Sequence, residues 1–111
     1  MVEISRLEAV LRRHPRFEQR CFSPGEREYC NRQHRPAQHF AARFAAKEAV
    51  AKALNAPVRW REIEVIGSGG PPRIELHGNT RAVAAGRAIS ISMSHSGDIA
   101  VAAAIAQGVD E

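Results

Sequence analysis

The stretch RFAAKEAVAKAL, from Arg43 to Leu54, decides the fold of this chain. Residues three or four positions apart share a helix face, so this stretch and the residues before it predict a long helix with an apolar stripe. The stripe comprises Phe40, Phe44, Ala51 and Leu54. Glu48 falls inside it, and a carboxylate buried without a partner costs several kcal/mol or becomes protonated. We therefore expect a bound cation, Lys52 one turn further on, or both beside Glu48.

The same stretch places one carboxylate among three cations. Lys47 and Glu48 are adjacent, Lys52 follows four residues after Glu48, and Arg43 precedes them. This layout suits a metal ion together with a phosphate group. A solvated Glu/Lys pair on an ordinary helix explains the segment equally well when it is taken alone.

Length and composition limit the class of protein. The 111 residues predict a single small domain, residues 1–111, with little room for a deep cleft within one subunit. A site shared between subunits is therefore plausible. A hydrophobic content of 44% excludes disorder, and no apolar run reaches the length of a membrane span.

Charge and cysteine usage indicate the compartment and the partners. Cys21 and Cys30 have no metal-ligand or redox spacing, and no leader sequence opens the chain, so we expect a soluble cytoplasmic protein. A net charge of +4 and a pI near 9.8 favour anionic partners. Nucleic acid, an acidic protein and a phosphorylated small molecule all fit that charge.

Two short helices are predicted before the long one. Ser5 with Glu8 three residues later has the pattern of a capping box, and that helix should end near His14-Pro15. A second helix should begin at Ser23-Pro24-Gly25-Glu26, where serine caps and proline suits the first helical position. Residues 31–38 read as a polar loop.

The long helix is expected from about Ala37 to Leu54, because Asn55-Ala56-Pro57 would stop it. Alternating apolar and polar residues then predict two hairpins with a helix between them. Their strands are residues 63–65 and 74–76, turning at 67–72, and residues 89–94 and 99–106, turning at 95–98, with the helix at 79–88. The fold class is therefore α+β, with a small antiparallel sheet packed on one long helix.

The third of these strands presents a row of hydroxyl groups. Ile89, Ile91 and Met93 face one side, whereas Ser90, Ser92 and Ser94 face the other. Small hydroxyl side chains let a ligand approach the backbone, and His95 and Ser96 follow at the strand end. A histidine at such a junction is often only a turn residue. A serine hydrolase is weakly supported, because no serine has the flanking glycines of a nucleophile elbow.

Four segments, taken together, resemble the holo-acyl-carrier-protein synthase family of phosphopantetheinyl transferases. They are RFAAKEAVAKAL, CFSPGE at Cys21 to Glu26, WREIEV at Trp60 to Val65, and SMSHSGDIAVAAAI at Ser92 to Ile105. The resemblance implies transfer of the 4'-phosphopantetheine arm of coenzyme A to a serine of an acyl carrier protein, for fatty-acid or polyketide synthesis. It also implies Mg²⁺, release of adenosine 3',5'-bisphosphate, and a homotrimer with sites between neighbouring subunits.

The resemblance assigns site residues by position. Glu48 is similar to the family's Mg²⁺ ligand, and Glu48, Lys52 and His95 would be catalytic, with either Glu48 or a metal-bound water as the general base. Coenzyme A would contact Arg43, Lys47, Lys52, Gly70, Pro71, Ser94, His95 and Ser96. The turn at Gly70 and Pro71 reads equally well as a plain hairpin turn.

Basic residues near the start of the chain match family positions that bind the acidic helix of the carrier protein. They are Arg6, Arg13, Arg16 and Arg20, with Phe17 as an aromatic anchor. A solvated basic face is the alternative. Nucleic acid is not an expected partner, because the aromatic residues do not gather on a strand face, and neither is a membrane.

The sequence departs from the family at its start. Family members have a strand that ends in Gly-x-Asp, and the aspartate of this motif is the second protein ligand to Mg²⁺. In an alignment with the family, that aspartate would stand immediately before Met1. One hypothesis is that Met1 is internal and the natural chain starts upstream. The other is a catalytically impaired protein that still binds the carrier protein. Asn55-Ala56 also replaces the family's usual glycine after the long helix.

Overall fold

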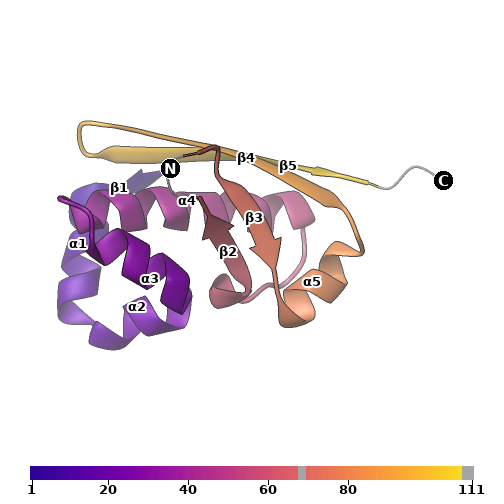
Figure 1. The fold of residues 1–111 in the computed structure, drawn as a ribbon, viewed down its shortest axis with the longest axis horizontal. Helices are drawn as coiled ribbons and strands as arrows, with labels where there is room; N and C mark the ends of the chain where they lie inside the picture. The colour runs from indigo at the N-terminus through magenta and orange to yellow at the C-terminus, as the bar shows by residue number, and fades with distance from the viewer. Residues whose placement is uncertain (68–69, 109–111) are drawn as a thin grey trace.

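The helix α4 (Pro36–Leu54) lies at the centre of the computed structural model, which describes residues 1–67 and 70–108 (Figure 1). The predicted long helix is therefore confirmed, and it begins one residue early because Pro36 suits the first helical position. Asn55 ends it in the left-handed conformation, with φ 52° and ψ 45°. None of the helices in the described ranges is long and apolar enough to cross a bilayer.

Two antiparallel sheets pack against α4. The hairpin of β4 (Ala88–Ser96) and β5 (Ile99–Gln107) runs along α4, and β1 (Val2–Glu3) pairs with β5, which gives the order β1-β5-β4. A separate sheet pairs β2 (Ile63–Ile66) with β3 (Arg73–Leu76). The α+β class and both hairpins are confirmed, but the sheet is divided in two.

The β4–β5 hairpin is longer than predicted. His95 and Ser96 are part of β4, where they pair with Ala100 and Ile99 of β5. The turn therefore consists of Gly97 and Asp98, and Gly97 has a φ of 57° that suits glycine. In the other hairpin, Ser68 and Gly69 of the predicted turn lie outside the described residues.

Three short helices form the N-terminal part of the fold: α1 (Ile4–Arg13), α2 (Pro15–Cys21) and α3 (Pro24–Asn31). The predicted capping box at Ser5 is wrong. Helix α1 begins at Ile4, and the backbone N–H and hydroxyl of Ser5 donate to the Asp98 carboxylate at 2.8 and 2.6 Å. A carboxylate from the distant β4–β5 turn thus replaces the local cap. The box at Ser23 and Glu26 is confirmed.

The connections to and from β2–β3 contain two further helical segments. A 3-10 turn, η1 (Trp60–Glu62), precedes β2, and α5 (Gly78–Ala84) follows β3. The predicted helix at 79–88 is shorter than expected, because Ala85 adopts a left-handed conformation with φ 52° and ends it. Neither η1 nor α2 was predicted.

The single apolar stripe predicted for α4 is wrong. Phe40 and Leu54 are buried, but Phe44, Ala51 and Glu48 are only half-buried. Several elements pack on different sides of α4, so that most of its circumference is covered: α1, α3, β1, β2, β4 and β5. The fully buried charged residue of this stretch is therefore Lys47 rather than Glu48.

Lys47 forms an ion pair with Glu26 of α3 inside the core. Its Nζ donates to Glu26 Oε1 at 2.8 Å, to the Trp60 carbonyl at 2.9 Å and to the Ile63 carbonyl. Both charged side chains are 0% exposed. Burial lowers the pKa of Lys47, and the negative charge of Glu26 opposes that shift.

Glu26 also accepts backbone N–H groups from two other segments. Ser23 N donates to its Oε1 at 2.8 Å, and Val65 N donates to its Oε2 at 2.9 Å. Both carboxylate oxygens of Glu26 therefore accept hydrogen bonds. A buried ion pair is tolerated when its remaining polar atoms are hydrogen-bonded in this way. The pair joins α3, α4 and β2.

Replacing Glu26 with glutamine should destabilise the protein by about 3–5 kcal/mol, because the Lys47 ammonium group would stay buried without its counter-charge. Urea denaturation measures this change in the free energy of unfolding. Glu28→Gln is the matched control, since Glu28 forms only an exposed pair with Arg32 at 3.8 Å. Equal stability of the two variants would contradict the central role of the buried pair.

Candidate functional site

A pocket between α3, α4 and β4 brings together four of the predicted coenzyme A contacts. They are Arg43, Gly70, Ser94 and His95. The pocket, here called the Arg43 pocket, is also lined by Tyr29, His39, Ala42, Gly67, Pro72 and Met93. Residues that are far apart in the sequence therefore meet at one place.

Arg43 is held rigidly in this pocket although it is charged. Its side chain is only 4% exposed, its guanidinium lies 4.2 Å from the centre of the Tyr29 ring, and its Nη2 donates to the Gly67 carbonyl at 3.3 Å. The Nε atom is buried and has no hydrogen-bond partner among the described residues. An unsatisfied buried donor costs about 1–3 kcal/mol, and the charge of Arg43 stays beside the pocket for an anionic ligand.

His95 lies on the side of β4 that also carries Ile91 and Met93, because alternate residues of a strand share a face. The side-chain nitrogen of Gln38 lies 2.6 Å from His95 Nε2 and 3.1 Å from Nδ1. Burial, followed by the positive charges of Arg43 and His95, lowers the pKa of the neighbouring His39. The lowered pKa of His39 disfavours its charged form, so His39 adds little positive charge beside Arg43.

Glu48 lines a different pocket, on the side of α4 that faces α1 and β1. This Glu48 pocket is lined by Met1, Val2, Glu3, Arg6, Leu7, Val10, Phe17, Phe44, Glu48 and Ile99. Glu48 is half-buried, and within the described chain it has no ion-pair partner within 4 Å. Of the two partners expected for Glu48, a bound cation or Lys52, the exposed Lys52 forms no ion pair with it in the described residues. The carboxylate is free to bind a cation.

The two pockets share no lining residue. Glu48 stands five positions after Arg43, and at 3.6 residues per turn this places the two side chains about 140° apart around the helix. One chain therefore does not bring Glu48 together with Arg43 and His95 in a single cavity.

Other predicted contacts are placed differently. Lys47 is completely buried and its donors are occupied within the core, so it cannot reach coenzyme A, and its assignment as a coenzyme A contact is wrong. Pro71, Ser96 and Lys52 are exposed and line neither pocket. They are open to a ligand or to another chain.

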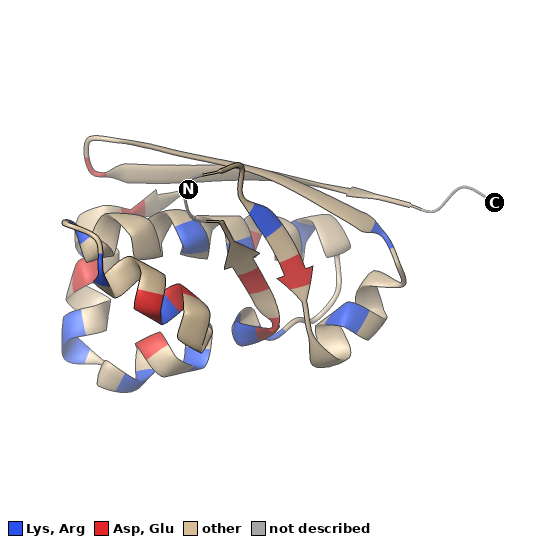
Figure 2. Cartoon of the chain, viewed as in Figure 1, with Lys and Arg blue, Asp and Glu red and all other residues tan. Residues whose placement is uncertain are grey.

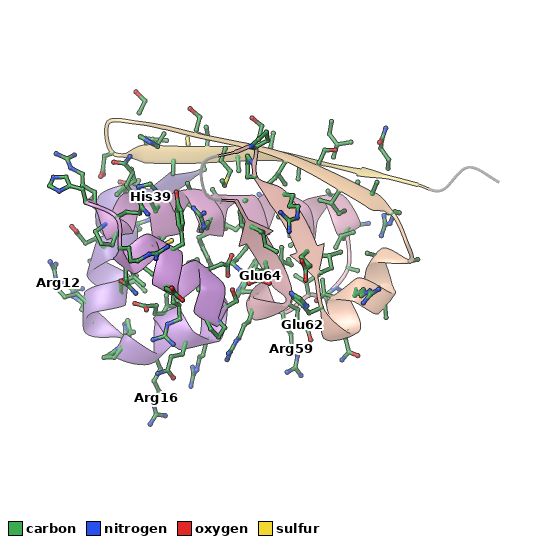
Figure 3. All side chains as sticks on the ribbon, viewed as in Figure 1. Arg12, Arg16, His39, Arg59, Glu62 and Glu64 are labelled. Carbon is green, nitrogen blue, oxygen red and sulfur yellow. The ribbon has the colours of Figure 1, made fainter. Side chains whose placement is uncertain are left out.

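The predicted docking residues lie on α1 and α2, which carry more basic than acidic side chains (Figure 2). Arg13, Arg16, Phe17 and Arg20 line one groove, and Arg6 lines the Glu48 pocket with Phe17. Figure 3 shows Arg12 and Arg16 pointing away from the fold. These five predicted residues, Arg6, Arg13, Arg16, Phe17 and Arg20, form a continuous basic surface that runs up to Glu48.

Sequence reasoning missed several residues of these pockets. Tyr29 and His39 form an edge-to-face pair at 5.8 Å beside Arg43, and Gln38 contacts His95. Glu3 lines the Glu48 pocket. His39 could have been predicted to lie beside Arg43, because it stands four residues earlier on the same helix face. The positions of Tyr29, Gln38 and Glu3 depend on tertiary packing, which the sequence does not show.

The family model of the 4'-phosphopantetheinyl transferase superfamily matches residues 1–104. A holo-[acyl-carrier-protein] synthase of Moorella thermoacetica is 44% identical, with 96% of this chain and 89% of that protein covered. The synthase of Anaeromyxobacter dehalogenans strain 2CP-1 is 42% identical, with 97% and 91% covered.

Solved structures agree with these relatives. Helicobacter pylori holo-[acyl-carrier-protein] synthase in complex with coenzyme A superposes with a TM-score of 0.83 at 28% identity, covering 96% of this chain and 95% of that one. The acyl carrier protein synthase of Mycobacterium tuberculosis gives a TM-score of 0.79 at 35% identity, covering 97% and 92%. The chain therefore belongs to the holo-acyl-carrier-protein synthase family of 4'-phosphopantetheinyl transferases, which confirms the resemblance.

Proposed function

We propose that this chain transfers the 4'-phosphopantetheine arm of coenzyme A to a serine of an acyl carrier protein. The observation that carries the proposal is the Arg43 pocket, where Arg43, Ser94 and His95 come together, in a chain whose relatives bear this activity in their names. The serine Oγ attacks the phosphorus of the pantetheine arm, an Oγ–P bond forms, and the P–O bond to adenosine 3',5'-bisphosphate breaks. The serine proton passes to a base.

In this proposal the Arg43 pocket binds the phosphate groups of coenzyme A. Arg43 supplies the charge, and His95 at the pocket wall donates to a phosphate oxygen. Gly70 has open space where a Cβ would stand, so a ligand can approach its backbone. Pro71, Ser94 and Ser96 adjoin these residues, and Lys52 would neutralise charge that builds on the leaving group.

Magnesium is the metal that fits the Glu48 pocket. Glu48 is an unpaired half-buried carboxylate, and Glu3 lines the same pocket as a second hard oxygen donor. Bound there, Mg²⁺ would neutralise phosphate oxygens and orient the reacting group. Glu48 would hold it, either directly or with Glu3, and would accept the serine proton itself or through water.

The complete site is proposed to form between subunits of a homotrimer. Catalysis requires the metal ligand and the coenzyme A contacts at one place, whereas one chain holds Glu48 and Arg43 on different sides of α4. The outer face of β4–β5 offers a surface for a neighbouring chain, because Val101 and Ile105 are 40% and 63% exposed there.

The basic surface on α1 and α2 is proposed to bind the acidic carrier protein. Its arginines surround Phe17, which packs against Phe44 with ring centres 5.7 Å apart. The alternative of a noncatalytic carrier-binding module is not favoured, because Glu48 keeps an unpaired carboxylate in the described chain and the relatives are named as synthases. Which carrier protein is the substrate, fatty-acid or polyketide, follows from the assay below.

The direct test mixes the chain with Mg²⁺, coenzyme A and candidate apo carrier proteins and follows the carrier mass by mass spectrometry. We expect the mass to increase by one phosphopantetheine group. The absence of any increase with every fatty-acid and polyketide carrier tried would contradict the proposed function.

Replacing Glu48 with glutamine should lower kcat by about a hundredfold or more, because shape is kept while the charge that holds Mg²⁺ is lost. Stability should stay within about 0.5 kcal/mol of the parent, since Glu48 has no partner in the described chain. Glu28→Gln serves as the control and should keep the parent rate. Turnover of Glu48→Gln at the parent rate would refute the metal assignment.

Charge reversal at Arg13 and Arg16 should raise the KM for the carrier protein about tenfold at low salt, with kcat and the KM for coenzyme A unchanged. Exposed charges act mainly on encounter and docking, and salt screens them. The matched control reverses Arg32 and Arg81, which gives the same net charge away from the basic surface. Equal KM values for the two double variants would show that no docking occurs through α1 and α2.

A further inference from the structure

The β2–β3 hairpin carries a histidine and two glutamates that belong to neither pocket of the proposed active site. One ligand atom each from Glu64, Glu75 and His77 lies within 4.8 Å of the other two. His77 Nε2 is 2.9 Å from Glu64 Oε1 and 3.9 Å from Glu75 Oε1. The three side chains thus converge on one point at the surface of the hairpin.

The backbone explains why they converge. Glu64 and Glu75 stand directly opposite each other in the β2–β3 register. His77 follows two residues after Glu75, so its side chain lies on the same face. Like charges directly opposite each other destabilise a strand pair, and a positive charge between Glu64 and Glu75 would relieve that repulsion.

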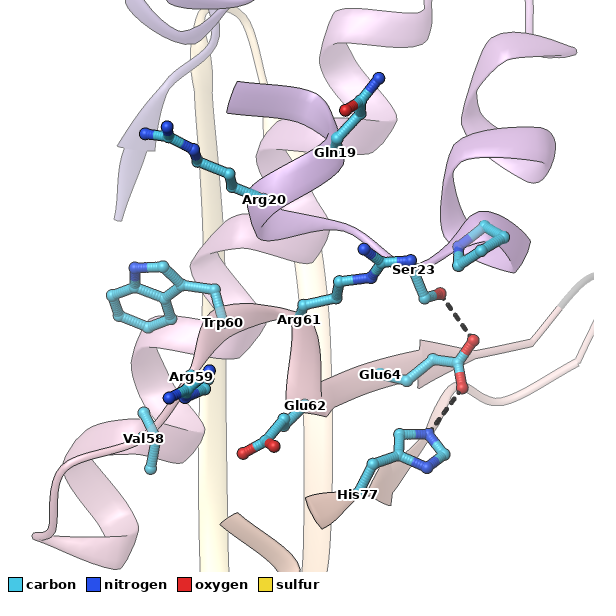
Figure 4. Close-up of a pocket in the computed structure, with 11 residues that line it drawn as sticks. Gln19, Arg20, Ser23, Val58, Arg59, Trp60, Arg61, Glu62, Glu64 and His77 are labelled. Carbon is cyan, nitrogen blue, oxygen red and sulfur yellow. Dashed lines mark hydrogen bonds and ion pairs between the residues drawn. The ribbon is translucent and has the colours of Figure 1, made fainter. Parts of the chain in front are cut away.

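Ser23 fixes one of these carboxylates from outside the hairpin. Its hydroxyl donates to Glu64 Oε2 at 2.6 Å, which leaves Oε1 directed toward His77 (Figure 4). Glu64 is therefore an oriented ligand, the arrangement that outer hydrogen bonds produce around metal ligands.

We propose that Glu64, Glu75 and His77 bind one divalent transition-metal ion of the zinc class. One imidazole nitrogen and two carboxylate oxygens suit Zn²⁺, whose bonds to such ligands are about 2.0–2.2 Å in a tetrahedral site. Tetrahedral bonds of that length separate the ligand atoms by about 3.4 Å, which lies between the 2.9 Å and 3.9 Å that separate His77 Nε2 from the Glu64 and Glu75 carboxylates. Glu64 is held by Ser23, so small rotations of the exposed Glu75 and His77 side chains would close the site.

The surroundings leave room for the fourth ligand. Glu64 and His77 form part of the wall of a surface pocket that also contains Ser23, Arg59 and Arg61. Figure 4 shows this pocket with Glu64 and His77 side by side. A water molecule or an anion can occupy the open position. When the ion binds, it takes the Nε2 lone pair of neutral His77, whose hydrogen then resides on Nδ1, and the His77–Glu64 hydrogen bond is replaced by two metal bonds.

This site is independent of the proposed transferase chemistry. It shares no residue with the Arg43 pocket or the Glu48 pocket. A bound ion would stabilise the folded chain by mass action. Through Glu64 it would also hold the hairpin against α3, because Glu64 accepts a hydrogen bond from Ser23, the residue that caps α3.

The test titrates ZnCl2 into the Glu48→Gln protein in chelator-free buffer by calorimetry and follows Tm in parallel, so that the candidate magnesium site does not contribute. We expect one equivalent of Zn²⁺ to bind and Tm to rise. Adding His77→Ala or Glu75→Gln should weaken binding at least tenfold and abolish the rise in Tm. His34→Ala is the control, because His34 is an exposed histidine outside the cluster, and it should change neither quantity.

Three results would overturn the proposal. They are no Zn²⁺ binding up to millimolar concentration, unchanged binding in His77→Ala, and equal weakening by His34→Ala. His77 is exposed and its backbone N–H bond to the Glu62 carbonyl does not involve the side chain, so the variant should fold. Circular dichroism of the metal-free variants verifies this.

Discussion

The ion pair between Lys47 and Glu26 is the interaction on which the rest of the structure depends. Taking two charges out of water is costly, and only complete hydrogen bonding makes such a pair tolerable. Here Glu26 binds Lys47, the start of α3 and the backbone of β2, while Lys47 also binds two carbonyls near β2. The pair therefore fixes the rotation of α4 about its own axis, which decides where every other side chain of α4 points.

With Lys47 directed into the core, the functional side chains of α4 emerge on two sides. Arg43 faces Tyr29 and β4, whereas Glu48 faces α1 and β1. Helix α4 thus separates the Arg43 pocket from the Glu48 pocket, and the Glu48 pocket borders the basic surface. In a chain of 111 residues this arrangement allows two half-sites, each completed by a neighbouring copy. The proposed composite site follows from this separation of Arg43 and Glu48 by α4.

Local signals predicted much of the fold, and tertiary contacts account for what was missed. The limits of α4, the capping box at Ser23 and the two hairpins follow from residues close in sequence. The Ser5 cap was wrong because Asp98 supplies the acceptor, and Lys47 was misassigned because its partner Glu26 lies in another element. The family resemblance assigned Arg43, Gly70, Ser94 and His95 to one ligand, coenzyme A. In the structure these four residues line the same pocket. Tyr29 and Gln38 gave no such signal.

Subunit complementation tests most directly the claim that Glu48 and His95 act together across a subunit boundary. Glu48→Gln and His95→Ala chains would be assayed for transfer separately and after co-refolding at equal amounts. Each variant alone should be nearly inactive, and the mixture should regain about a quarter of the parent activity, because random assembly gives that share of interfaces both intact groups. A mixture as inactive as its components would contradict the account and place both groups within one chain.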